Sequence, residues 1–470
     1  MLRGKLRELM DLAMLHPWPE EDMRARIRAS ARRSHESLVA IDDDPTGCQT
    51  VHDVPILTVW SVEALQRQFA AGEPVVFVLT NSRSLPESEA VVVNREVAAN
   101  IAAAARATGR RAPVLSRSDS TLRGHFPAET DALSEVLGPF DGVLLAPYFA
   151  EGGRLTIDDV HYVKRDDHLI PAAETELAKD PTFGYTRSNL REWVEEKSGG
   201  RWRADHVPSI GIPDIRQGGP ARVAAILREV TDGVPVVINA VSDRDLEVAV
   251  LGLLDAEAGG KRFLYRTGAS FVKVRGGVTD QELLSADELP GREAGGGLTI
   301  VGSYVRWTTA QLERLRKLPD IEPVELSVPD ILDPGRREAT LSHVVAEASA
   351  RLRRGRDAVV FTSREFVTGA DAAESLRIAA TVSEALVAIV RRLDVTPRYL
   401  IAKGGITAHD VATRGLGVER AVVMGQIALG VPVWRLGDES KFPDIPYIVF
   451  PGNVGTEETL ADVATALRGQ

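Results

Sequence analysis

The sequence contains a single cysteine, Cys48, in 470 residues. One cysteine cannot form an intramolecular disulfide, and it excludes a cysteine-rich zinc site. This scarcity is typical of proteins in the reducing cytoplasm, so we expect a cytoplasmic protein. The chain also lacks any apolar run near the roughly 20 residues that a membrane-spanning helix needs, so we expect no membrane partner.

Basic residues are too few to balance the acidic ones. The chain has 56 Lys and Arg against 67 Asp and Glu, a formal net charge of -11. A protein that binds a nucleic-acid duplex neutralises its phosphates with clustered basic side chains, so we do not expect nucleic acid as a partner. A small anionic substrate remains compatible, because it needs only a local group of Arg or Lys.

The pattern along the chain predicts two α/β domains. A length of 470 residues exceeds one ordinary hydrophobic core. Short apolar runs such as SLVAI and PVVFVLT alternate with helical stretches, which is typical of a mostly parallel sheet flanked by helices. The segment ELPGREAGGG has the Pro and Gly content of a linker, and the alternation begins again after it. We predict a helical N-terminal extension over 1–36, a first domain over 37–287, a linker over 288–297 and a second domain over 298–470, with the active site in the cleft between the domains.

Within the extension, Leu2, Leu6 and Leu9 recur at helical spacing. We expect this apolar stripe to pack against the body of the protein or against a second subunit. In the second case the chain forms a homodimer.

Polar side chains follow the predicted strands of the first half. In an open parallel sheet, ligands bind beyond the carboxyl ends of the strands. Arginine binds carboxylates bidentately, and carboxylates and hydroxyls suit a polyol, so this edge predicts a small, anionic, hydroxylated ligand. The residues are Asp42, Asp43, Asp44, Thr46 and Gly47 after the first run, Thr80, Asn81, Ser82 and Arg83 after the second, Arg117, Asp119, Ser120, Thr121, Arg123 and Gly124 after the third, and Glu151 and Arg154 after the fourth.

The strands of the second half end in glycine-rich loops. These are GS at 302–303, GGIT at 404–407 and GNVG at 452–455. Glycine lets backbone N–H groups approach phosphate oxygens closely, and a helix that follows adds further donors. Together the two halves predict a transferase that moves a phosphoryl group from a nucleotide to a hydroxylated acid.

Six motifs in combination resemble the four-carbon acid sugar kinases. They are DDPTG at 43–47, NSR at 81–83, SDSTLRG at 118–124, and the GS, GGIT and GNVG loops of the second half. The resemblance covers most of the chain from about Leu38 onward. It implies a kinase that uses ATP to phosphorylate a terminal hydroxyl of an acid such as threonate, erythronate or 3-oxo-tetronate. It also implies that the first domain binds the sugar acid and the second binds the nucleotide.

The resemblance also implies roles for particular residues, with ATP and Mg²⁺ as cofactors. It makes Asp43 or Asp44 the group that accepts the hydroxyl proton or holds Mg²⁺, and these two roles stay open. The catalytic candidates are Asp43 and Asp44; the substrate-binding candidates are Thr46, Gly47, Arg83, Arg117, Asp119, Ser120, Arg123 and Gly124; the nucleotide-binding candidates are Ser303, Gly404, Gly405, Ile406, Thr407, Gly452, Asn453 and Gly455.

The chain departs from the motifs of this family at several positions. Arg117 replaces a lysine before the DST motif, Ile406 replaces the glutamate of GGET, and Phe450 and Pro451 replace the lysine and serine of KSGNFG. The last two departures keep a second hypothesis open, a nucleotide or metabolite sensor without catalysis. A third is a metal-dependent hydrolase or aldolase that uses the aspartates, although it leaves the glycine loops unexplained.

Overall fold

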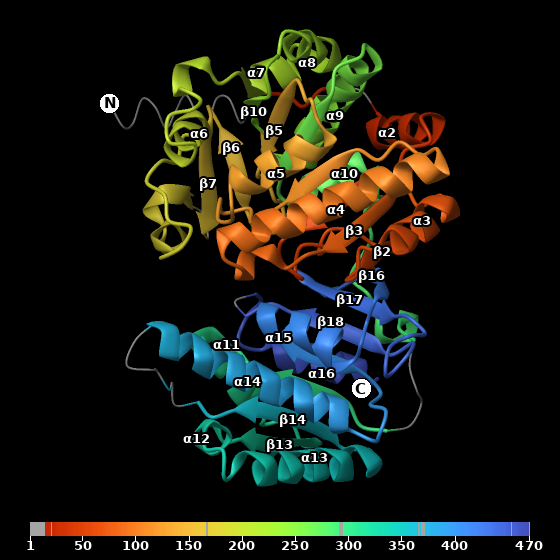
Figure 1. Ribbon diagram of the computed structural model, residues 1–470, viewed down its shortest axis with the longest axis vertical. Helices are drawn as coiled ribbons and strands as arrows, with labels where there is room; N and C mark the ends of the chain where they lie inside the picture. The colour runs from red at the N-terminus through yellow and green to blue at the C-terminus, as the bar shows by residue number, and fades with distance from the viewer. Residues whose placement is uncertain are drawn as a thin grey trace. The chain divides into compact units, whose positions relative to one another are not determined.

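The structure is a computed structural model that describes residues 15–19, 21–165, 168–290, 295–364, 367, 372–452 and 454–469. It separates into two compact units, one of Met1–Val51 and Val59–Asp280 and the other of His52–Thr58 and Gln281–Gln470 (Figure 1). Each unit has a largely parallel sheet with helices packed on it, so the predicted α/β class is confirmed. The predicted stripe of Leu2, Leu6 and Leu9 lies outside the described residues.

A parallel sheet forms the centre of the first unit. All residues of β3, β1, β4, β11 and β5 are buried, as expected for strands covered by helices on both faces. In spatial order its strands are β3 (Val75–Leu79), β1 (Leu38–Asp42), β4 (Val114–Arg117), β11 (Phe263–Thr267), β5 (Gly142–Ala146), β10 (Val234–Ile238) and β9 (Ser209–Ile210).

Amphipathic helices connect these strands, and α4 is the long orange helix that crosses in front of the sheet in Figure 1. Helix α9 begins at a capping box, in which Ser242 Oγ accepts from Asp245 N at 3.3 Å and the Asp245 carboxylate accepts from Ser242 N at 3.0 Å. The helices are α2 (Met23–Arg33), α3 (Val62–Ala71), α4 (Glu87–Thr108), α5 (Ala128–Leu137), α6 (Leu190–Lys197), α7 (Ile212–Arg216), α8 (Gly219–Arg228), α9 (Asp243–Ala258) and α10 (Ala269–Arg275).

A small antiparallel sheet lies in the segment between β5 and β9. Its strands are β6 (Arg154–Ile157), β7 (Val160–Arg165) and β8 (His168–Pro171). The amino-acid pattern does not indicate this sheet, because its short strands alternate little. Val163 of this sheet packs in one core cluster with Trp193 of α6 and with Leu122, which lies in the SDSTLRG loop. The small sheet therefore supports that loop.

The second unit has a sheet that is parallel on one side and antiparallel on the other. Five neighbouring strands run parallel, and the remaining pairings are antiparallel. In spatial order the strands are β13 (Ile321–Leu326), β14 (Asp357–Thr362), β12 (Leu298–Val301), β15 (Leu400–Lys403), β18 (Pro446–Phe450), β17 (Val431–Leu436), β16 (Arg420–Ala428) and β2 (Val54–Leu57).

Helices pack on this second sheet, α11 against α16 and α13 against α14. The longest of them named in this unit is α14, with 21 residues. The helices are α11 (Arg306–Leu315), α12 (Val328–Leu332), α13 (Arg337–Arg353), α14 (Ala372–Arg392), α15 (Gly405–Asp410), which continues as a π-helical turn over Val411–Gly415, and α16 (Thr459–Leu467).

The compact units differ from the predicted domain ranges at two places. Strand β2 lies within the predicted first domain, but it pairs antiparallel with β16 and so extends the second sheet. The second unit also begins at Gln281, before the predicted boundary, and Leu284 N donates to Gln426 O of β16 at 2.7 Å. Local composition cannot reveal such pairings, because the partners lie far apart in the sequence. Part of the predicted linker, residues 291–294, lies outside the described residues.

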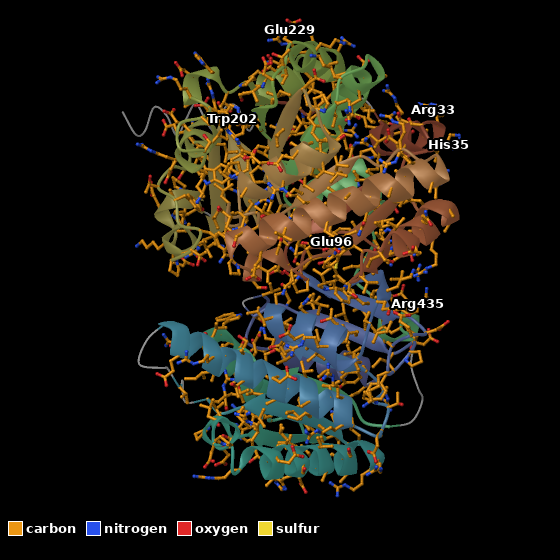
Figure 2. The ribbon with its side chains drawn as sticks, in the orientation of Figure 1. Arg33, His35, Glu96, Trp202, Glu229 and Arg435 are labelled. Carbon is orange, nitrogen blue, oxygen red and sulfur yellow. The ribbon has the colours of Figure 1, made fainter. Side chains whose placement is uncertain are left out.

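Charged side chains cover the outside of the units. Arg33, Glu229 and Arg435 are exposed (Figure 2). Among the helices that the structure describes, we find none with the length and apolar character to span a membrane.

Candidate functional site

The carboxyl ends of three strands meet at one edge of the first sheet. Asp42, the last residue of β1, pairs in register with Leu79 of β3 and with Arg117 of β4. The loops that follow these strands therefore start side by side, although their residues are far apart in the sequence. This is the edge where open parallel sheets bind ligands.

Arg83 joins the first two loops by holding two aspartates. Its Nε donates to Asp43 Oδ2 at 3.1 Å, its Nη2 donates to Asp43 Oδ1, and its Nη1 donates to Asp44 Oδ2 at 3.3 Å. Ser118 Oγ donates to Asp43 Oδ2 at 2.7 Å and so ties in the third loop. The structure thus brings together residues that the three motifs supply separately.

Asp43 and Asp44 differ in how far they reach solvent. The Asp43 side chain is 3% exposed, whereas that of Asp44 is 23% exposed. Asp44 Oδ1 accepts from Thr46 N at 2.8 Å and also from Thr46 Oγ1. Burial opposes ionisation of Asp44, but Arg83 and these bonds outweigh it and hold the pKa of Asp44 below its usual range.

Asp42 is fully buried and paired with Arg117. Arg117 Nη1 lies 3.4 Å from Asp42 Oδ1, and Asp42 Oδ2 has no hydrogen-bond partner among the described residues. Burial, reinforced by the charges of Asp43 and Asp44, raises the pKa of Asp42 to about 7 despite Arg117. Arg117 was predicted to bind substrate, but here it is buried and directed at Asp42. Gly47 packs so closely on Asp42 that a side chain at 47 would overlap its carboxylate.

The SDSTLRG loop carries a second arginine–aspartate pair. Arg123 Nε donates to Asp119 Oδ2 at 2.6 Å, and Thr121 Oγ1 donates to the same oxygen. Burial opposes ionisation here too, yet Arg83, Arg123 and Thr121 together hold the pKa of Asp119 well below its usual range. Asp119 is therefore a carboxylate with a stable negative charge.

Gly124 ends this loop in a conformation that glycine tolerates best, with φ of +124°. A Cβ there would lie 2.6 Å from Ser118 Oγ, 2.8 Å from Arg266 Nη2 and 3.1 Å from Asp43 Oδ2. The predicted importance of Gly124 therefore has a steric basis in the packed groups around it.

The small sheet and the segment that leads from it to α6 both hold the SDSTLRG loop. His161 Nε2 donates to Ser120 O at 2.7 Å, and Tyr185 OH donates to Thr121 O at 2.7 Å. His161 is fully buried, and burial lowers its pKa to about 4, so it is neutral near pH 7. Beside the loop, Ser118, Asp119, Arg123 and Trp193 line a cavity of only about 10 Å³.

A second cluster forms at the carboxyl ends of β12, β15 and β18 in the second unit. Thr308 Oγ1 donates to Gly452 O at 2.9 Å and lies within hydrogen-bond distance of Ser303 Oγ, at 3.2 Å. A side chain at Gly404 would lie 3.1 Å from Ser303 Cβ and 3.4 Å from Thr407 Oγ1. Four of the predicted nucleotide-binding residues, Ser303, Gly404, Thr407 and Gly452, are therefore packed together.

The other predicted nucleotide-binding residues lie around this cluster. Gly405 and Ile406 begin α15, and the Ile406 side chain is 61% exposed. Gly455 O accepts from Trp307 Nε1 at 3.2 Å, which joins the GNVG loop to α11. Asn453 lies outside the described residues.

Two basic side chains that the sequence analysis missed lie at the same edge. Arg364, just after β14, donates from Nη1 and Nη2 to Ser303 O at 3.0 Å each. Lys403, the last residue of β15, is fully buried. Its Nζ donates to Pro451 O and lies 4.3 Å from the centre of the Phe450 ring. The resembled motif KSGNFG has lysine and serine where this chain has Phe450 and Pro451. The Nζ of Lys403, on the neighbouring strand β15, thus reaches both of these positions.

Some of these missed residues left a signal in the sequence. Lys403 is the last residue of the strand LIAK, and Arg266 is the next-to-last residue of the strand FLYRT; both strands are otherwise largely apolar. Arg266 Nη1 donates to Ser116 Oγ and to Glu129 Oε2, both at 2.7 Å. A charge at a strand end within an apolar run is costly to bury without a partner, and it marks a position worth noting. His161 left no such signal, because its partners are set by tertiary packing.

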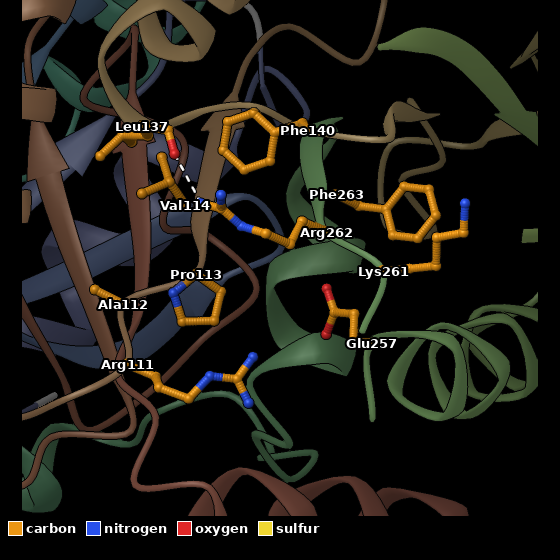
Figure 3. Close-up of a pocket in the computed structure, with 10 residues that line it drawn as sticks. All are labelled: Arg111, Ala112, Pro113, Val114, Leu137, Phe140, Glu257, Lys261, Arg262 and Phe263. Carbon is orange, nitrogen blue, oxygen red and sulfur yellow. Dashed lines mark hydrogen bonds between the residues drawn. The ribbon is translucent and has the colours of Figure 1, made fainter. Parts of the chain in front are cut away.

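A further cavity of about 210 Å³ lies away from both clusters (Figure 3). It is lined by Val114 and Phe263, the first residues of β4 and β11, and so it lies at the amino-terminal edge of the first sheet. Two of its basic side chains already bind protein groups. Lys261 Nζ lies 3.1 Å from Asp141 Oδ1, and Arg262 Nη2 donates to Leu137 O at 2.7 Å. We therefore place the candidate site at the carboxyl edge.

Solved structures share this fold. A Haemophilus influenzae protein, HI1011, aligns over 92% of this chain and 100% of its own with a TM-score of 0.63 and 20% identity. A protein from Salmonella typhimurium LT2 aligns over 93% of this chain and 98% of its own, with a TM-score of 0.66 and 20% identity. At this identity the likeness establishes the fold alone.

Curated relatives match most of the chain. A D-erythronate kinase of Heliobacterium modesticaldum is 28% identical over 76% of this chain and 77% of its own length. A D-threonate kinase of Cupriavidus necator is 26% identical over 77% of this chain and 80% of its own length.

Two family models match most of the chain in succession. Residues 38–275 match a sugar-binding N-terminal domain, and residues 298–460 match a nucleotide-binding C-terminal domain. The two matches agree with the two clusters in order along the chain, and they confirm the resemblance drawn from the motifs. The chain belongs to the four-carbon acid sugar kinase family.

Proposed function

We propose that this protein is an ATP-dependent kinase that phosphorylates a hydroxyl group of a small sugar acid. The relatives named above act on four-carbon acids, erythronate and threonate, and we extend that substrate class to this chain. The terminal hydroxyl is the proposed acceptor. The cytoplasmic location and the homodimer remain predictions.

The observation that carries the proposal is the pair of clusters at strand ends. In the first unit, Arg83 and Arg123 lie among Asp43, Asp44 and Asp119, which suits an acid with several hydroxyls. In the second unit, glycine loops and basic side chains suit a polyphosphate. Transfer requires the acceptor oxygen to reach the γ-phosphorus, so the proposal requires the two clusters to meet in the ternary complex.

We assign the reacting carboxylate to Asp44 and a positioning role to Asp43. Asp43 is nearly fully buried and bound by Arg83 and Ser118, whereas Asp44 is the more exposed of the two. In the reaction, the hydroxyl oxygen forms a bond to the γ-phosphorus as the bond to the β-phosphate oxygen breaks. ADP leaves, and the hydroxyl proton passes to the Asp44 carboxylate or to a water that it holds.

The residues present fit Mg²⁺ that arrives with ATP. No group of three or more His, Cys, Asp or Glu that could hold a metal occurs in the described ranges. Mg²⁺ is usually bound by one or two carboxylates together with substrate phosphates, so a protein cage is not required. Asp44 is the carboxylate that would contact it, and the ion would neutralise charge on the phosphates.

The test measures ADP release with MgATP against a panel of four- to six-carbon aldonic and keto acids. The variants are Asp43→Asn and Asp44→Asn, with the exposed Asp287→Asn as a matched control. We expect turnover with at least one four-carbon acid, a loss of kcat of about 10²-fold or more in Asp44→Asn, and unchanged turnover in the control.

Other outcomes separate the alternative hypotheses. Turnover of an acid without ATP but with a divalent metal would favour the hydrolase or aldolase. Tight binding of ATP with no turnover across the panel would favour the sensor. If Asp44→Asn keeps full activity, the assignment of the reacting carboxylate is wrong.

A further inference from the structure

Lys403 is a fully buried lysine for which the described part of the chain supplies no ion pair. Its hydrogen-bond acceptor is a neutral carbonyl, Pro451 O, and its aromatic neighbour is Phe450. Lysines are almost never fully buried unless they are paired. Burying an ammonium group without a counter-charge costs free energy, which a carbonyl and a ring offset only in part.

The lysine lies at the centre of the glycine-lined cluster. Lys403 O accepts from Ser303 N at 3.4 Å, and Phe450 O accepts from Gly404 N at 2.8 Å. Lys403 and Phe450 are also direct partners in the register of β15 and β18. The residues that flank Lys403 are thus the same ones that form the predicted phosphate loops.

We propose that the counter-charge of Lys403 is a phosphate group of the bound nucleotide, held by the loops after β12, β15 and β18. This inference rests on the proposed function and adds to it a residue that the family motifs do not contain. The Nζ group neutralises the phosphate directly or through one water molecule. Before the nucleotide binds, Pro451 O holds the ammonium group in place.

The charge state of the lysine agrees with this role. Burial lowers the pKa of Lys403 to about 7, and no charged neighbour contributes to the shift. Arg364, the other basic side chain described above at this edge, donates both Nη groups to Ser303 O. An approaching phosphate would supply a negative charge beside Lys403, and it would stabilise the protonated lysine.

The experiment compares inorganic tripolyphosphate and MgATP binding by calorimetry in wild type and in Lys403→Met, which replaces the ammonium group by an uncharged, unbranched side chain one atom shorter. Lys441→Met is the matched control. Lys441 Nζ also donates to backbone carbonyls, Val390 O and Arg391 O, and lies 5.2 Å from the Phe442 ring. It lies outside the glycine cluster.

We expect Lys403→Met to weaken binding of both ligands tenfold or more, and Lys441→Met to change it less than twofold. We also expect Lys403→Met without ligand to be at least as stable as wild type in urea, because a buried charge has been removed. Lys403→Gln, which keeps a donor for Pro451 O, repeats the test if the methionine variant fails to fold. It should bind as weakly.

Two results would overturn the inference. One is unchanged affinity in both Lys403 variants, and the other is a wild type that binds neither tripolyphosphate nor MgATP. A structural lysine would instead lower stability when replaced and leave the affinity of the folded fraction intact. Wild type that binds tripolyphosphate through Lys403 but phosphorylates no acid would uphold this inference while the kinase proposal fails.

Discussion

Three consecutive aspartates have three different environments in this protein. Asp42 is the last residue of β1 and forms an ion pair with Arg117. Asp43 accepts from the guanidinium group of Arg83, and Asp44 accepts from Thr46 N within its own loop. Their charges differ accordingly, because burial raises the pKa of Asp42 and hydrogen bonds and Arg83 lower that of Asp44. Identical residues side by side can therefore serve different purposes.

We predict a pH-dependent contribution of Asp42 to stability. Its pKa is raised from 3.8 to about 7 in the folded state, so the folded protein keeps a proton that the unfolded chain releases. The stabilisation is fully present below about pH 4 and is lost as the pH rises through 7. Relative to Asp42→Asn, wild type should lose about 2 kcal/mol of unfolding free energy between pH 5.5 and 8.

Urea denaturation of both proteins at the two pH values gives this difference. Asp287→Asn, which changes an exposed carboxylate, should show no such trend. A difference between wild type and Asp42→Asn that does not vary with pH would mean that Asp42 is ionised in the folded protein throughout.

We predict that Gly124→Ala disrupts the first cluster. The new Cβ has no space beside Ser118 and Arg266, and its backbone has a φ of +124°. The expected loss of stability is about 2–4 kcal/mol, with weaker binding of the acid.

Gly199→Ala separates strain from crowding, because Gly199 has a φ of +62° and a Cβ added there would meet no atom within 4 Å. It should cost only about 1 kcal/mol. Equal losses in the two variants, measured by urea denaturation, would contradict the steric explanation.

Elements position the clusters through the register of parallel strands. Because β3, β1 and β4 end at the same level, short loops suffice to bring Arg83, Asp43 and Ser118 together. The SDSTLRG loop has a second support, the small sheet of β6, β7 and β8. That sheet lies in one continuous segment of the chain, and His161 of β7 donates a hydrogen bond to the loop. Tyr185, between the sheet and α6, donates a second one.

We predict that His161→Ala raises the KM for the acid about tenfold and leaves the affinity for MgATP unchanged. The imidazole is neutral, accepts from Thr156 Oγ1 at 2.9 Å and donates to Ser120 O, so its removal frees the loop without changing its charge. His168→Ala is the matched control, because His168 lies on the same sheet and is exposed. Steady-state kinetics with both substrates measure the effect, and equal KM values in the two variants would show that the small sheet does not position the loop.

On the scale of the whole molecule, the chain does not divide at a single point. Residues 52–58 leave the first unit, pair with β16 of the second, and return. The pairing runs from Val54↔Val423 to Leu57↔Arg420, and Thr58 N donates to Glu419 O at 3.0 Å. The second unit therefore needs a strand from the N-terminal half to complete its sheet.

We predict that a fragment of residues 281–470 is unstable by itself. Without β2, the edge of β16 exposes unpaired N–H and C=O groups, and exposed edges promote aggregation. The same fragment with residues 50–60 joined through a flexible linker should be more soluble and should unfold at a higher urea concentration. Size-exclusion chromatography and urea denaturation measure both effects. If the two fragments behave alike, β2 is dispensable for the second unit.

The α/β class, most of the central strands and the motifs that form the two clusters follow from the amino-acid sequence alone. These features are local, since a buried parallel strand is a continuous apolar run and its functional loop follows it directly. Asp43, Asp44, Arg83 and Gly124 could be named for this reason.

The tertiary structure alone determined which side chains contact one another. The fold directed Arg117 to Asp42, placed β2 in the second sheet, and set His161 behind Ser120. It also brought the lysine of one strand beside the phenylalanine of the next, at Lys403 and Phe450. Each of these contacts joins segments that are distant in the sequence, and no local sequence pattern indicates the partner. Their positions were fixed by burial and by pairing between distant segments, and not by local preference.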